Sequence, residues 1–176
     1  MCKENTNHNR EQIFVDNENI AVLIEQIKKA IDDFLQNDLQ LIDLGVHENS
    51  ITHHIACYLK KYIQGWHIDC EYNRDLRETK SISGIGDIRP DIIIHHRNSS
   101  SNLMIIEIKK NLDKSDRDEQ KIRKLTDPNL HFFYNLGIYL NIFESNPPIF
   151  KGKIFKTGEE YSTFEYPDSL EQFGER

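Results

Sequence analysis

The spacing of hydrophobic residues divides the chain into helices and strands. Apolar residues three and four positions apart predict an amphipathic helix over residues 18–35 and a second over 47–64. Aliphatic runs bounded by polar or turn-forming residues predict strands. We place these strands at residues 67–72, 89–94, 103–108, 136–142 and 149–155. A polar, charged segment over residues 116–125 is typical of a further helix. This mixture of helices and strands predicts an α/β fold.

Charged residues stand beside the aliphatic runs of two predicted strands. The first strand contains Pro90-Asp91, and the second ends in Glu107-Ile108-Lys109. Because side chains alternate across a strand, Glu107 and Lys109 share one face and Ile108 lies on the other. Carboxylates and an ammonium group are costly to bury without partners. A divalent metal together with a phosphate would supply those partners.

This pattern resembles the PD-(D/E)XK nuclease superfamily, which has the restriction-endonuclease-like fold. The resemblance implies that Asp91 and Glu107 bind Mg²⁺ or Mn²⁺, and that the catalytic Lys109 positions or activates the attacking water. The residue types suit this chemistry because Mg²⁺ binds one or two carboxylates and keeps waters for a substrate phosphate. The plain alternative is an Asp and a Glu-x-Lys that occur at this loose spacing by chance.

Glu48 stands near the start of the second predicted helix. It precedes Ile51 by three residues and Ile55 by seven, which places it on the apolar side. Many members of the superfamily carry a Glu on the helix before the first core strand, directed at the metal. The resemblance therefore assigns Glu48 as a third catalytic and metal-binding carboxylate. An acidic residue in a first turn also complements the helix dipole, which explains its place along the helix but not its face.

The order of elements supports the same resemblance. Helix, three strands, helix and strand over about residues 48–143 is the core order of the superfamily. The implied fold is a central mixed β-sheet flanked by helices, with residues 18–35 as an extra N-terminal helix. We expect a disordered N-terminus over 1–16 and a single domain over 17–160 with its core at about 44–156. An acidic C-terminal tail would then occupy residues 161–176.

The predicted helix at 116–125 is rich in basic residues. In the superfamily this helix often presents a basic or amide side chain to the substrate backbone, which makes Lys121, with Lys124 behind it, the substrate-binding candidates. The alternative is a solvated helix face with interspersed charges.

Composition limits the partners and the compartment. The chain of 176 residues has a formal net charge of −7, whereas a nucleic-acid-binding protein usually has a basic surplus. We therefore expect weak or structure-selective binding, or a homodimer or partner protein that supplies specificity. The sequence has no apolar run of about twenty residues, which argues against a membrane span. Its three cysteines have no disulfide pattern, which favours the cytoplasm.

Three functions follow, in order of preference. The first is a metal-dependent nuclease that hydrolyses phosphodiester bonds of DNA, where the choice of DNA over RNA comes from the resemblance alone. The second is a non-catalytic domain of the same fold that binds nucleic acid or protein, since a fold does not dictate a function. The third is an α/β domain unrelated to nucleases.

Overall fold

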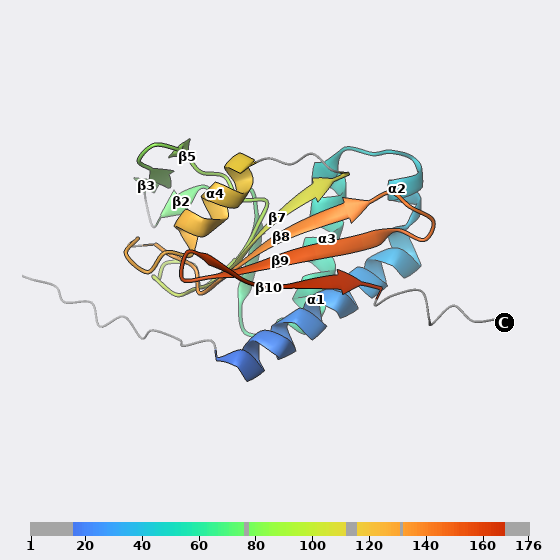
Figure 1. Cartoon of the computed structure of the whole chain (residues 1–176), viewed down its shortest axis with the longest axis horizontal. Coiled ribbons are helices and arrows are strands. Elements are labelled where there is room, and N and C mark those ends of the chain that lie inside the picture. The colour runs from blue at the N-terminus through green and yellow to red at the C-terminus, as the bar shows by residue number, and fades with distance from the viewer. Residues whose placement is uncertain (1–15, 76–77, 112–115, 131, 168–176) are drawn as a thin grey trace, which may run out of the picture.

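The computed structural model describes residues 16–75, 78–111, 116–130 and 132–167, and the account below is confined to them. It contains a mixed six-stranded β-sheet with helices on both faces (Figure 1). The α/β class and the mixed sheet flanked by helices are therefore confirmed. Within the described residues, no helix combines the length and apolar character needed to cross a membrane.

Four helices are present, and the long ones agree with the hydrophobic periodicity. They are α1 (Asn17–Asp38), α2 (Gln40–Asp43), α3 (Glu48–Tyr62) and α4 (Asp116–Leu125). The Asp16 carboxylate accepts a hydrogen bond from the Asn19 N–H at 2.9 Å, which caps the start of α1. The expected disorder of residues 1–15 lies outside the described residues.

The main sheet has the strand order β1-β6-β7-β8-β9-β10. Its strands are β1 (His67–Cys70), β6 (Ile92–His95), β7 (Asn102–Lys110), β8 (Leu136–Phe143), β9 (Ile149–Lys156) and β10 (Glu159–Tyr166). Only β7 and β8 pair in parallel, and α4 lies in the connection between them, as a parallel pair requires a crossover. Two short hairpins lie between β1 and β6 in the chain. They are formed by β2 (Arg74–Asp75) with β3 (Glu78–Thr79), and by β4 (Ser81–Ile82) with β5 (Gly86–Asp87).

Two of the predicted boundaries were wrong. The strand expected at 89–94 begins only at Ile92, because Pro90 has no N–H to donate and interrupts the ladder. Residues 161–166, expected in an acidic tail, belong to the edge strand β10. This strand is anchored by Phe164 and Tyr166, which pack against the core, and the Tyr166 hydroxyl bonds to Asp32 of α1.

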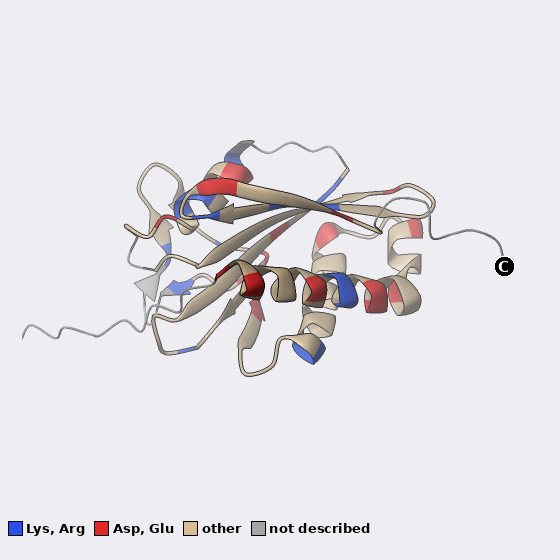
Figure 2. Ribbon diagram, turned by 60° about the horizontal axis from the view of Figure 1, so that its bottom comes forward, with Lys and Arg blue, Asp and Glu red and all other residues tan. Residues whose placement is uncertain are grey.

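The two faces of the sheet carry different helices. One face packs against α1 and α3 through an aliphatic cluster that includes Ile94 and Ile106. The other face packs Ile93 and Ile105 against Leu125 of α4. Figure 2 shows α1 below the sheet, with acidic and basic positions along the helix. Because side chains alternate, the residues that share a face with Ile93 and Ile105 are directed toward the α4 side.

Candidate active site

The candidate residues meet where β6 begins and β7 ends, on the face of the sheet that α4 covers. The antiparallel register places Ile92 opposite Ile106, so the next step brings Asp91 opposite Glu107. The two carboxylates therefore stand side by side on one face, as strand alternation requires. The N–H of Ile108 donates to Asp91 Oδ2 at 2.8 Å, which fixes the Asp91 side chain against β7.

Glu107 is a buried carboxylate with one unsatisfied oxygen. Its side chain is 1% exposed, and its Oε2 lies 2.7 Å from the Lys121 ammonium group. Its Oε1 has no hydrogen-bond partner among the described residues. Burial, aided by the charge of Asp91 and opposed by Lys121, raises the pKa of Glu107 to about 8. An oxygen in this position is available to a cation.

Asp91 is perturbed in the same direction. Burial is the largest cause that raises its pKa, while the Ile108 N–H and the charges of Lys109 and Lys121 act to lower it. Two adjacent buried carboxylates repel each other when both are ionised. A bound cation would relieve that repulsion.

Glu48 reaches this site from the first turn of α3. Its Oε1 accepts a hydrogen bond from Lys109 Nζ at 2.9 Å, and its Oε2 accepts one from the Lys110 N–H at 3.1 Å. The predicted inward face of Glu48 is therefore confirmed. Burial acts to lower the pKa of Lys109, but the hydrogen bond and charge of Glu48 outweigh it and raise that pKa above its ordinary value. Glu48 is thus turned toward Lys109 and the end of β7.

The two lysines of α4 have different surroundings. Lys121 is directed into the site, where it contacts Glu107 and lies 3.6 Å from Asp118. Lys124 is exposed and donates to the carbonyl of Ser83 at 3.2 Å, so it joins α4 to the β4–β5 hairpin and not to the carboxylates. The expected contact of Lys124, behind Lys121, with a substrate stays a prediction.

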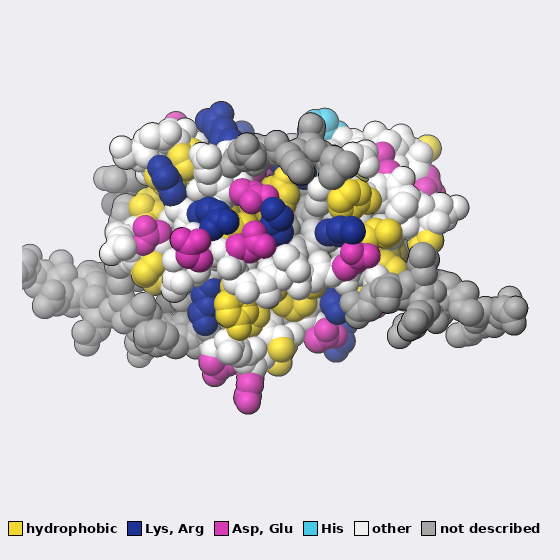
Figure 3. All heavy atoms as spheres, viewed as in Figure 1, with side chains coloured by type: hydrophobic (Ala, Val, Ile, Leu, Met, Phe, Trp, Pro, Cys, Tyr) yellow, Lys and Arg dark blue, Asp and Glu magenta, His cyan; other side chains and the backbone are white. Residues whose placement is uncertain are grey.

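Sequence reasoning missed Asp118. Its carboxylate lies 3.7 Å from Lys109 Nζ and 3.6 Å from Lys121 Nζ, so it bridges the two lysines. The three-residue spacing from Asp118 to Lys121 was a usable signal, since helix residues at this spacing are neighbours. Opposite charges thus alternate from Glu48 through Lys109, Asp118 and Lys121 to Glu107. Figure 3 shows the same interleaving of basic and acidic side chains on the surface of this side.

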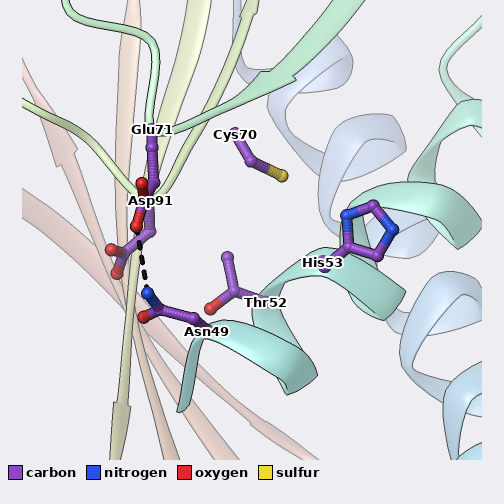
Figure 4. A pocket seen from close by; sticks show the side chains of 6 residues that line it. All are labelled: Asn49, Thr52, His53, Cys70, Glu71 and Asp91. Atoms are coloured by element: carbon purple, nitrogen blue, oxygen red, sulfur yellow. Dashed lines mark hydrogen bonds between the residues drawn. The ribbon is translucent and has the colours of Figure 1, made fainter. Parts of the chain in front are cut away.

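A pocket of about 310 Å³ adjoins Asp91. Figure 4 shows that α3 contributes one side of it and that Cys70, Glu71 and Asp91 contribute the other. The lining residues are Asn49, Thr52, His53, Cys70, Glu71 and Asp91. Across its mouth, the Asn49 amide donates to Glu71 Oε1 at 3.0 Å.

The site fits a hard divalent cation through two carboxylates. In the part of the chain that the structure describes, no three His, Cys, Asp or Glu side chains are grouped as a metal-binding set. Mg²⁺ needs only one or two carboxylates and keeps several waters. Asp91 and Glu107 meet that requirement, because both are oxygen donors and Glu107 Oε1 is unpaired.

Comparison of the chain with protein-family models, with curated proteins and with solved structures found no match in any of the three.

Proposed function

We propose that this chain is a Mg²⁺- or Mn²⁺-dependent nuclease of the PD-(D/E)XK type that hydrolyses phosphodiester bonds of DNA. The observation that carries the proposal is the buried Glu107, whose Oε1 has no partner among the described residues and whose pKa is raised in part by the nearby charge of Asp91. A buried carboxylate of this kind destabilises the protein unless it has a function or a ligand. The choice of DNA over RNA comes from the resemblance alone.

The topology also favours this type. The order α3, β1, β6, β7, α4 and β8 is the core order on which the resemblance depends. The sheet further places the end of β7 beside the start of α3, although Glu48 and Lys109 are 61 residues apart in sequence. We therefore propose the restriction-endonuclease-like fold as the more specific description of the α/β sheet.

In this proposal Asp91 and Glu107 would hold the cation. Glu48 would lie near the cation, beside Lys109. The cation would stabilise negative charge on the phosphoryl group and lower the pKa of a coordinated water. Lys121 now provides the positive charge beside Glu107. With the cation present, Lys121 would be free to contact a substrate phosphate.

Lys109 would orient the attacking water. Its 2.9 Å ion pair with Glu48 favours the ammonium form. An ammonium group donates hydrogen bonds and accepts none, so it can position a water or a phosphate oxygen but cannot accept a proton. Between the two roles expected for this lysine, its surroundings favour orientation over deprotonation.

Calorimetric titration of Mn²⁺ and Mg²⁺ tests the proposal. We expect the wild type to bind Mn²⁺, and Asp91→Asn to lose most of that binding. Asp87→Asn is the matched control, because Asp87 is an exposed residue of β5. A cleavage screen on single-stranded, duplex and branched DNA, and on RNA, then reports the reaction. Absence of Mn²⁺ binding to the wild type, with a DNA oligonucleotide present, refutes the catalytic assignment.

One observation favours the second function, a non-catalytic binding module. The polar groups of the site already have partners within the protein, Glu48 with Lys109 at 2.9 Å and Glu107 with Lys121 at 2.7 Å. Such a network could persist as structure without turnover. The same titration separates the two functions, since a module of this kind would show no specific Mn²⁺ binding that depends on Asp91.

A further inference from the structure

The pocket beside Asp91 is built together with the candidate active site. The N–H of Glu71, which is in the left-handed backbone region at φ 50°, donates to the carbonyl of Asp91 at 3.1 Å. This bond links the pocket wall to the residue that precedes β6. Any ligand in the pocket would therefore lie next to the carboxylate that we propose for the metal.

The lining of the pocket disfavours a phosphate group. Neither lysine nor arginine is among its six lining residues, whereas Glu71 and Asp91 are both carboxylates. Arg89 lies 3.9 Å from Glu71 Oε2, but its side chain is 64% exposed and is not part of the lining. A phosphate inside the pocket would therefore meet two carboxylates and no lining cation, which is unfavourable at short distances. The occupant should be uncharged or should offer hydrogen-bond donors.

The remaining surfaces suit a flat, partly apolar group. Figure 4 shows the Thr52 methyl group, the Cys70 thiol and the His53 ring around the open space. The amide of Asn49 and the carboxylate of Glu71 offer a donor and acceptors at the mouth. A nucleobase edge presents this combination of groups. The volume of about 310 Å³ is also at the small end of ligand pockets.

We propose that this pocket receives one unpaired nucleobase of the strand whose phosphate lies at Asp91 and Glu107. The inference rests on the proposed nuclease function and specifies its substrate. A base inside a duplex is stacked and paired, so it cannot enter a pocket without being extruded. The substrate class is therefore single-stranded or locally unpaired nucleic acid.

This substrate class is compatible with the acidic chain. Binding through a base depends less on neutralised phosphates than binding along a duplex backbone does. A protein with a net charge of −7 can therefore use such a contact.

Fluorescence anisotropy in the presence of Ca²⁺ provides the test. The probes are a labelled single-stranded oligonucleotide, a blunt hairpin duplex of the same sequence, and a base-free strand of tetrahydrofuran spacers of equal length. We expect the single strand to bind about tenfold more tightly than either of the others, which is the effect of one buried base. Equal binding of the base-free strand would overturn the inference, because that strand has the same phosphates.

Two positions provide matched variants. Cys70 lines the pocket, whereas Val22 is exposed on α1 outside the lining. We expect Cys70→Phe to reduce single-strand affinity about tenfold, to the base-free level, and Val22→Phe to leave it unchanged. If Cys70→Phe does not fold, as judged by circular dichroism, Asn49→Ala replaces it with the same expected direction. Full affinity in the folded pocket variant refutes the assignment.

Two further measurements identify which proposal fails. Mn²⁺ titration of His53→Ala should match that of the wild type, because His53 lies across the pocket from Asp91 (Figure 4), and a loss of single-strand affinity in this variant then reports on the pocket alone. If the wild type does not bind Mn²⁺, the proposed nuclease function is refuted. If it binds Mn²⁺ but shows no preference for the strand that carries bases, only the proposed nucleobase pocket is refuted. A free deoxynucleoside should compete far more weakly than the strand. If it bound as tightly, the pocket would be a small-molecule site.

Discussion

Replacement of Glu107 by glutamine should stabilise the metal-free protein, and the gain should increase with pH. The substitution keeps the shape of the side chain and removes its charge. In the wild type that charge is buried, with Oε1 unpaired and Asp91 adjacent. Glutamine resembles the protonated form of the carboxyl group, so the difference between the two proteins measures the cost of ionisation.

The expected magnitude follows from the pKa of Glu107, which changes from an ordinary 4.5 to about 8 in the folded chain. Between these values the folded state retains a proton that the unfolded state releases, so stability falls as pH rises through this interval. At 1.36 kcal/mol per unit, the cost is about 3 kcal/mol at neutral pH and about 5 kcal/mol above the folded pKa. Below the ordinary pKa the two proteins should be equally stable.

Urea unfolding in EDTA, at about pH 4, about pH 7 and about pH 9, measures this difference. Glu160→Gln is the control, because Glu160 is exposed on β10 and a surface change of this kind should stay within about 0.5 kcal/mol. A stability difference between Glu107→Gln and the wild type that is independent of pH would refute the reasoning. A difference of opposite sign would show that Lys121 outweighs burial.

Three further outcomes are expected. Lys109→Met should reduce DNA cleavage at least about 100-fold while Mn²⁺ binding persists in calorimetry; equal loss of both would contradict an orienting role. Gly137→Val should cost about 1–3 kcal/mol in urea unfolding, because a Cβ at Gly137 would collide with Ile122 of α4. Asp69→Asn should cost about 2 kcal/mol at neutral pH. The Arg97 guanidinium lowers the pKa of Asp69 from its ordinary 3.8 to about 2. The cost of Asp69→Asn should therefore disappear as the pH falls from about 3.8 to about 2. A cost that persists at lower pH would contradict an ion pair between Asp69 and Arg97.

Strand alternation was sufficient to predict which residues share a face with Glu107 within its own strand. The adjacent, antiparallel arrangement of the two strands came from the structure, whereas the sequence had brought Asp91 and Glu107 together only through the family resemblance. The orientation of Glu48 was also predictable, because the helical period fixes which residues share the buried side. These predictions succeed because each depends on one element.

Other features depended on packing that the local pattern does not contain. The edge strand β10 is exposed at most of its positions, so its period is masked and only Phe164 and Tyr166 reveal its inner side. The rotation of α4 about its own axis decides that Lys121 points into the site and that Lys124 points to solvent. Ile122 and Leu125 set that rotation, because both are buried between α4 and the sheet.

The net negative charge of the chain is compatible with phosphate binding, because many of the acidic residues lie far from the candidate site. The acidic residues of α1 lie on the other side of the sheet from α4, because the two helices pack on opposite faces. Exposed charges are largely screened beyond about 8 Å at physiological salt, so they contribute little at the site. Within the site, four carboxylates (Glu48, Asp91, Glu107 and Asp118) face two ammonium groups (Lys109 and Lys121). Full ionisation leaves two negative charges, which one divalent cation would neutralise. In the proposed function, phosphate binding therefore depends on the cation and not on a basic surface.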